Sequence, residues 1–349
     1  MIDMHVHLRD WAQRDKETLA HGMGVALLCG VDELFDMPNT SPPLTEREAI
    51  LKRLEDASQC NAAVRYHLWA GVTSDYDQLM EVVKLHHELF PRVIGLKMFA
   101  GHSTGNMGLT EEESQKHVYQ TLAQADYQGV LALHCEKESL LRPDLEKSDD
   151  FSSHSLARPV AAEVASVQDQ IRFAIEAGFK GHLHLCHLSS IETLLLVEDA
   201  RARGVRISCG LTPHHALLTT VDAQQRGLYA KMNPPLRSET ERSALFSALL
   251  AGRIDWIETD HAPHTLADKE GGASGIPGFS GLLLLVKALV EAGASEKLLM
   301  RLLGQRVLEV FGLEERPITL VPYDELSLRS LAAAKEYPFD SFANLRLRW

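Results

Sequence analysis

The sequence predicts a (β/α)8 barrel of the TIM type, in which eight parallel strands are surrounded by helices, within a chain of 349 residues. Strand-like segments alternate with amphipathic, helix-like segments along nearly the whole chain, with no linker rich in Pro, Gly or Ser. Polar residues also recur where these strand-like segments end, which is where barrel enzymes carry their chemistry. An open doubly wound sheet is the structural alternative, because the number of segments alone does not exclude it.

The expected strands are short apolar runs at 2–8, 31–37, 64–71, 92–99, 128–134, 182–187, 204–209 and 254–259. Amphipathic stretches that predict helices lie between them at 16–29, 44–57, 75–90, 110–126, 156–178, 189–203 and 238–252. Two more helix-like stretches, 279–293 and 296–312, follow the last strand. We therefore expect the barrel over residues 1–312 and a C-terminal tail, packed on the barrel, over residues 313–349.

Composition and charge restrict the class of protein. A hydrophobic content of 45% can form a large core, and a net charge of -13 argues against nucleic acid or an anionic membrane as a partner. A small anionic substrate remains compatible with this charge. Strand-like sequence begins at Ile2 without a leader, and five scattered cysteines without a Cys-x-x-Cys pair indicate reduced thiols. We expect a cytoplasmic protein.

The first strand carries the first candidate metal ligands. His5 and His7 are two residues apart, so their imidazoles leave the same face of a strand and can close on one metal ion. Arg9 continues that face and adds a fixed positive charge. A surface strand with two solvated histidines is the alternative for this segment considered alone.

Four further metal-competent residues stand at or near the ends of later strands, namely Lys97, His134, His187 and Asp260. A lysine that faces a barrel interior beside metal ions must lose its positive charge, and carbamylation by carbon dioxide would convert it into a bridging carboxylate. Each residue also has a structural alternative: a snorkelling lysine, hydrogen-bonded core histidines and a helix-capping aspartate. His184 lies three residues before His187, which predicts the opposite strand face and a structural role.

Together these motifs resemble the dihydroorotase family within the amidohydrolase superfamily. The resemblance extends over essentially the whole chain and follows the motif order of the family. The matching segments are HVHLRD at 5–10, DMPNT at 36–40, GLKMF at 95–99, HCE at 134–136, CHLSS at 186–190, TPHH at 212–215, KMNPPLR at 231–237, TDHAPHT at 259–265 and GFSG at 278–281.

The resemblance implies two zinc ions bridged by carbamylated Lys97. One ion would be held by His5, His7 and Asp260, and the other by His134 and His187. A hydroxide between the ions would open the ring amide of dihydroorotate, with Asp260 acting as general base and then general acid. The reverse direction would cyclise N-carbamoyl-L-aspartate to (S)-dihydroorotate in pyrimidine biosynthesis.

The resemblance also implies a set of substrate-binding residues. Dihydroorotases hold the substrate carboxylate with the Arg of H-x-H-L-R and the Asn of M-P-N-T, and hydantoinases and allantoinases usually differ at both positions. The full expected set is Arg9, Asn39, Thr104, Asn233, His264, Pro277 and Gly278. Thr104 lies in a segment, 101–106, that is either a lid over the substrate or an ordinary loop.

Alternatives remain open at this point. A hydantoinase-like or allantoinase-like cyclic amidase and a non-catalytic scaffold are the competing functions, and Mn, Co or Ni fit the same ligands as zinc. Many relatives also carry a small β-sandwich beside the barrel. This sandwich is expected to be absent or vestigial here, and the apolar surface left uncovered near the termini favours a homodimer, although the sequence does not fix the oligomeric state.

Overall fold

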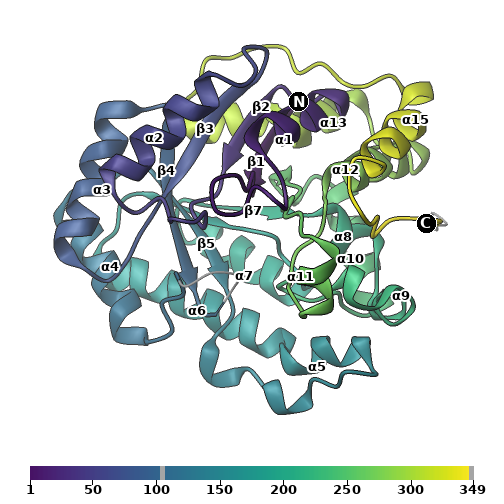
Figure 1. The fold of residues 1–349 in the computed structure, drawn as a ribbon. Coiled ribbons are helices and arrows are strands. Elements are labelled where there is room, and N and C mark those ends of the chain that lie inside the picture. Colours follow the sequence, from purple (N-terminus) through teal and green to yellow (C-terminus); the bar gives the residue numbers. More distant parts are fainter. Residues whose placement is uncertain (103–106, 346–349) are drawn as a thin grey trace.

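The computed structural model describes residues 1–102 and 107–345, and its eight parallel strands form one sheet in which neighbours in sequence are neighbours in space (Figure 1). The last strand is tied back to the first, since Val6 pairs with His261 and the His7 N–H donates to the His261 carbonyl at 2.7 Å. The predicted barrel is thus confirmed, and the open sheet is excluded. The strands are β1 (Ile2–Val6), β2 (Glu33–Asp36), β3 (Arg65–Gly71), β4 (Val93–Ala100), β5 (Val130–Cys135), β6 (His182–Leu185), β7 (Ile207–Leu211) and β8 (Trp256–Ile257).

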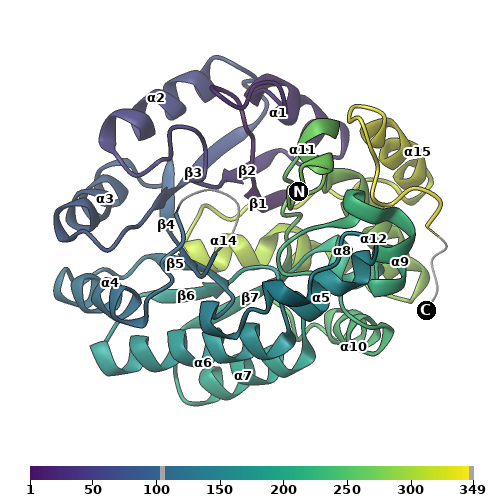
Figure 2. The same cartoon turned by 60° about the horizontal axis from the view of Figure 1, so that its bottom comes forward.

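Helices surround these strands, as Figure 2 shows most plainly. The α-helices are α1 (Leu19–Leu28), α2 (Arg47–Ser58), α3 (Tyr76–Leu89), α4 (Glu112–Gln124), α5 (His154–Ala157), α6 (Val160–Ala177), α7 (Ile191–Ala202), α8 (Pro213–Leu217), α9 (Thr220–Arg226), α10 (Glu239–Leu250), α11 (Leu266–Glu270), α12 (Phe279–Glu291), α13 (Glu296–Met300), α14 (Arg306–Phe311) and α15 (Tyr323–Ala334). Shorter helical turns are η1 (Glu138–Leu140), η2 (Pro143–Leu145), η3 (Phe151–Ser153), η4 (Gly227–Ala230) and the π-type η5 (Arg301–Gln305).

The core follows from the apolar strands. Nearly every strand residue is buried, because the helices cover the outer face and side chains fill the interior. At the amino-terminal end of the barrel, Phe311 of α14 packs edge-on against Phe35 and Trp69, with ring centroids 5.2 and 5.7 Å apart. Chemistry is therefore restricted to the opposite, carboxyl end of the strands.

Two of the differences between the predicted and the observed elements have a clear local reason. The helix expected over 156–178 is divided into α5 and α6, because Pro159 lies between them, lacks an N–H and disfavours helix in the residue before it. The strand expected over 254–259 contains only the two residues of β8. The chain then turns, and Asp260 adopts a left-handed φ of 48°.

Residues 313–345 contain one helix, α15, and every strand of the described residues belongs to the barrel. The Ser330 hydroxyl of α15 donates to the Ser280 carbonyl of α12 at 2.9 Å, and Arg329 reaches the Leu28 carbonyl at 3.2 Å. The boundary at residue 312 between barrel and tail remains a prediction. No helix in the described part of the chain combines the length and apolarity that crossing a bilayer requires.

A buried cluster joins this tail to the end of β8. The Glu17 carboxylate lies 3.2 Å from His261 Nε2 and accepts from the Tyr337 hydroxyl at 2.7 Å. The Gly278 N–H donates to His261 Nδ1 at 3.1 Å, which leaves the proton of the imidazole on Nε2, facing Glu17. Burial opposes ionisation, but His261, His21 and Tyr337 lower the pKa of Glu17 from 4.5 to about 2.

Replacing Glu17 with Gln is expected to lower the free energy of unfolding at pH 7 by roughly 1.5–3 kcal/mol, the range for hydrogen bonds to a charged group. Because the folded-state pKa of Glu17 is depressed, this contribution is complete above about pH 4.5 and disappears as the pH falls toward 2. Urea unfolding of wild type and Glu17→Gln at several pH values measures it, with the exposed Glu55→Gln as control. A difference between wild type and Glu17→Gln that stays constant from pH 7 to pH 3 would contradict the assignment.

Candidate active site

A cavity opens at the carboxyl end of the barrel, where the strand-terminal polar residues converge. It is lined by His5, His7, Arg9, Asn39, Phe99, His134, His187, Asn233, Asp260, Ala262, Ser274 and Gly275. Eight of the thirteen predicted site residues belong to this lining. His5 and Asp260, 255 positions apart in the sequence, therefore lie in the same cavity wall.

His5, His7 and Asp260 form the tightest group of metal-type donors in the cavity. Asp260 Oδ1 lies 3.3 Å from His5 Nε2 and 2.9 Å from His7 Nε2. Two ligand atoms that each lie about 2.0 Å from one tetrahedral zinc are about 3.3 Å apart, so this spacing suits a shared cation. His7 Nδ1 lies 2.6 Å from Asn39 Oδ1, which places the proton of His7 on Nδ1 and the lone pair of Nε2 toward Asp260.

A second pair, His134 and His187, lies beside the first group. His134 Nδ1 and His187 Nε2 are 3.2 Å apart, and the rings of His5 and His187 have centroids 5.2 Å apart. His134 Nε2 donates to Glu136 Oε2 at 3.0 Å, and Glu136 is paired with Arg158 at 2.5 Å. The lone pair of His134 Nδ1 therefore points at His187, while Nδ1 of His187 has no partner among the described residues.

Lys97 is buried inside the barrel, close to His134 and His187. Its ammonium donates to Cys186 Sγ at 3.0 Å and lies 5.0 Å from the centre of the Phe99 ring. Within residues 1–102 and 107–345, no carboxylate forms an ion pair with Lys97. Burial lowers the pKa values of His134 and His187, and the positive charge of Lys97 lowers them further, as expected for three groups at close range.

The protonation states of this cluster suit a cation site. Burial lowers the pKa of His7 to about 4. Burial also opposes the ionisation of Asp260, but His5 and His7 hold its pKa well below the usual value. His5 is the exception, because Cys186 and Asp260 overcome burial and raise its pKa to about 10. A ligating His5 must therefore release a proton, which a bound cation would favour.

His184 does not face away from the cavity residue His187 as the sequence predicts, because the alternation of side chains stops at the end of β6. His184 was expected to face away from His187, but both contact Glu258: His184 Nε2 lies 3.0 Å from Oε2, and the His187 N–H donates to Oε1 at 2.6 Å. β6 ends at Leu185, and His187 has a left-handed φ of 40°, so counting by twos fails there. His184 points into the barrel, and the turn directs His187 to the cavity.

Arg9 and His264 lie side by side at the edge of the cavity. Arg9 Nε donates to the Pro263 carbonyl at 3.2 Å, and its Nη2 lies 3.4 Å from His264 Nε2. His264 Nε2 is also 3.1 Å from the Ser274 carbonyl. Both side chains are almost fully buried, and burial, together with the charge of Arg9, lowers the pKa of His264 to about 3.

The remaining predicted residues divide into two groups. Thr104 lies outside the described residues, so its expected role in a lid stays a prediction. Lys97, His264, Pro277 and Gly278 are described but are not part of the cavity lining, and the Gly278 N–H donates to His261 Nδ1.

Sequence reasoning missed other residues of the site. Ser274 and Gly275 line the cavity, and the glycine-rich stretch 271–275 after His264 was the available signal. Glu258, a carboxylate in an apolar strand, was also overlooked.

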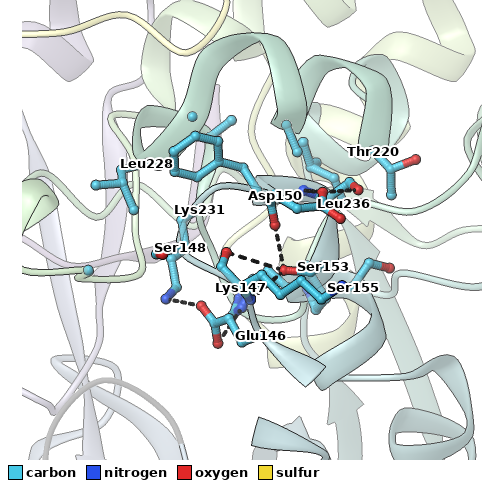
Figure 3. Close-up of a pocket in the computed structure, with 18 of the residues that line it drawn as sticks. Glu146, Lys147, Ser148, Asp150, Ser153, Ser155, Thr220, Leu228, Lys231 and Leu236 are labelled. Carbon is cyan, nitrogen blue, oxygen red and sulfur yellow. Dashed lines mark hydrogen bonds and ion pairs between the residues drawn. The ribbon is translucent and has the colours of Figure 1, made fainter. Parts of the chain in front are cut away.

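A second pocket of about 380 Å³ lies next to this cavity, between η3, α9 and the loop 270–272 (Figure 3). Lys231 Nζ and Glu146 Oε1 are 2.5 Å apart in it. His154, from its wall, reaches Asn233 of the first cavity, with Nε2 2.9 Å from Oδ1. Its only imidazole is that of His154, so it lacks the donor cluster of a metal site.

Comparison with known proteins identifies the family. No family model matches the chain, but individual relatives do. It is 33% identical over 359 residues to a dihydroorotase of Brevibacillus brevis, covering 99% of this chain and 80% of that relative. It is 34% identical over 305 residues to a dihydroorotase of Methanosarcina mazei, covering 83% of this chain but 64% of the relative. This chain belongs to the dihydroorotase family.

Solved structures agree with this membership in fold. An L-hydantoinase from Arthrobacter aurescens matches with a TM-score of 0.82 and 25% identity, covering 92% of this chain and 72% of that protein. A dihydroorotase from Saccharomyces cerevisiae matches with a TM-score of 0.73 and 20% identity, covering 91% of this chain and 85% of that protein. The dihydroorotase family and its hydantoinase neighbours therefore share the barrel seen here.

Proposed function

We propose that this chain is a dihydroorotase, which interconverts N-carbamoyl-L-aspartate and (S)-dihydroorotate in pyrimidine biosynthesis. The observation that carries the proposal is the convergence of two donor groups and Arg9 on one cavity wall, with buried Lys97 close to His134 and His187. The donor groups fit the hydrolysis of an amide, and the guanidinium fits a substrate that carries a carboxylate. Family membership supports the same assignment.

We infer a pair of divalent cations as the cofactor, most simply zinc, because the donor set combines imidazoles with carboxylates. His5, His7 and Asp260 would hold one ion, and His134 and His187 the other. Lys97 would bridge them as N6-carboxylysine. The spacing of the first three ligand atoms and the lone pair of His134 Nδ1 fit this assignment. A buried Lys97 beside imidazoles and without a carboxylate partner also favours conversion of its ammonium into an anion.

When bound, the ions would polarise the ring amide carbonyl and lower the pKa of a water molecule. The residues of the chain perform the remaining tasks. Asp260 is ionised at neutral pH, so it can take a proton from the attacking water and deliver it to the ring nitrogen as the C–N bond breaks. Arg9 binds the substrate carboxylate, and Asn39 orients His7 and adds an amide beside it. Asn233 lines the substrate side, and His264 lies next to Arg9.

A hydantoinase-like amidase is the competing function, because an L-hydantoinase matches the fold with a TM-score of 0.82. A non-catalytic scaffold is the other competitor, although scaffolds of this kind have no need to retain six metal-type donors. We also infer a reducing, cytoplasmic compartment from the five free cysteines. The oligomeric state that we propose is a homodimer.

The direct test is an assay with dihydroorotate and N-carbamoyl-L-aspartate, alongside hydantoin and allantoin. We expect turnover of the first two with a kcat/KM at least about 10³-fold above that of the neutral ring compounds, because a site built to bind a polar group rejects analogues that lack it. Preferential turnover of hydantoin would favour the hydantoinase alternative. Absence of turnover of all four compounds by metal-loaded protein would favour the scaffold.

Replacing Arg9 with Met should raise KM for dihydroorotate and lower kcat/KM by roughly 30-fold or more, the equivalent of about 2 kcal/mol or more for a lost buried charge contact. Activity on hydantoin, which has no carboxylate, should change little. Steady-state kinetics on both substrates measure the contrast, and the exposed Arg14→Met is the matched control. An equal loss of kcat/KM on both substrates would show that Arg9 does not bind the substrate carboxylate.

Replacing Lys97 with Met should reduce the bound metal from two ions per chain to one or none, because the bridging group is lost. Elemental analysis of purified protein measures the metal content. Protein loaded with ¹³C-bicarbonate should give a carbamate signal by NMR in wild type and none in Lys97→Met. The exposed Lys52→Met serves as control. A Lys97→Met protein that retains two ions would refute the bridging role.

A further inference from the structure

Glu258 is a fully buried carboxylate with a partner for each oxygen. Oε2 lies 3.0 Å from His184 Nε2 and accepts from Trp256 Nε1 at 3.0 Å, while Oε1 accepts from the His187 N–H at 2.6 Å. The carboxylate is therefore held by contacts from β6, from the turn after it and from β8.

The same carboxylate faces the first candidate metal group. Glu258 Oε1 lies 3.4 Å from His5 Nδ1, on the side of the ring opposite the nitrogen that faces Asp260. A metal-binding histidine commonly directs its second nitrogen to a carboxylate, which fixes the tautomer and the ring orientation. Oε1 of Glu258 thus accepts from the His187 N–H and lies at ion-pair distance from His5 Nδ1, which has no hydrogen-bond partner among the described residues.

The contact with His187 supports an unusual backbone conformation. His187 has a φ of 40°, a left-handed value that is uncommon for residues other than glycine. The hydrogen bond from its N–H to Glu258 holds the peptide in this turn, and the turn directs the imidazole toward His134.

Neighbouring strands are shaped to accept this carboxylate. A Cβ atom at Gly210 of β7 would lie 2.3 Å from Glu258 Oε2, so the glycine leaves the space that the carboxylate occupies. His184, which contacts Glu258, is held in turn: its Nδ1 lies 3.1 Å from the Ser208 hydroxyl, and this hydroxyl lies 2.8 Å from His182 Nε2. This chain of hydrogen bonds fixes His184, and His184 fixes Glu258.

We propose that Glu258 is a positioning residue that orients His5 and His187, one from each half of the candidate metal site, through a single carboxylate. The proposal rests on the proposed function, because it treats both histidines as metal ligands. In this proposal Glu258 acts through the two histidines, although its carboxylate, His5 and Cys186 also lie close enough together to hold an ion. Removing it loosens both histidines at once, so affinity for the metal falls without loss of any ligand.

The test uses the full chain stripped of metal and titrated with Co²⁺ in competition with a chelator, with the visible absorption of bound Co²⁺ as the spectroscopic signature. Glu258→Gln is expected to bind Co²⁺ about 10- to 100-fold more weakly, the usual effect of losing such a support, with an altered spectrum. Gly210→Ala keeps Glu258 but displaces its carboxylate, so weaker Co²⁺ binding and an altered spectrum are expected here too. It also carries the test should Glu258→Gln fail to fold.

Glu33→Gln is the matched control, because Glu33 is a buried carboxylate bonded to His67 at the other end of the barrel. It should leave Co²⁺ binding unchanged. Wild-type affinity and spectrum in both Glu258→Gln and Gly210→Ala would overturn the proposal. A third Co²⁺ ion that is present in wild type and absent in Glu258→Gln would also overturn it, since Glu258 would then be a ligand. A wild-type chain that binds two Co²⁺ ions but turns over neither pyrimidine precursor contradicts the proposed function alone.

Discussion

The site depends on how the barrel closes. The last strand contains two residues, and the chain after it is joined to β1 by a bridge between Val6 and His261, with a hydrogen bond of 2.7 Å, and by hydrogen bonds from Thr259 to Asp3. That bridge places Asp260 between His5 and His7. Glu17 and Gly278 hold His261 from the other side. Thus the geometry of the donor group depends on contacts among the first residues, the last strand and the tail, and these meet only in the completed fold.

Buried charge is the second constraint. The carboxyl end of the barrel encloses Lys97 and an imidazole, His5, whose pKa is raised by its neighbours, and such cations are costly to bury without anions. Asp260 and Glu258 flank His5 on either side and supply the opposite charges. Every one of these groups lies near a proposed ligand or is one. The interior therefore remains polar where an ordinary barrel would be filled with branched apolar side chains.

Sequence reasoning recovered what depends on position along a strand and missed what depends on contacts between strands. His5, Lys97, His134 and Asp260 stand at or near strand ends, and the structure brings His5, His134 and Asp260 together in one cavity with Lys97 close to His134. The direction of His184 was wrong because alternation stops where the chain leaves the strand. Glu258 carried no signal of its own, since its partners come from β1 and β6 and its space from Gly210.

The same reasoning explains why Lys97 is better regarded as a reactive group than as a structural one. A structural lysine in this interior would be expected to pair with Asp260 or Glu258, yet both carboxylates are directed at histidines, and the ammonium contacts a thiol and an aromatic ring. The anion beside the ammonium is the Cys186 sulfur, because Lys97, His5 and His184 overcome burial and lower the pKa of this thiol to about 5. If Lys97 instead carries a carboxylate, as we propose, the same position contributes a negative charge to a site whose imidazoles can bind a cation.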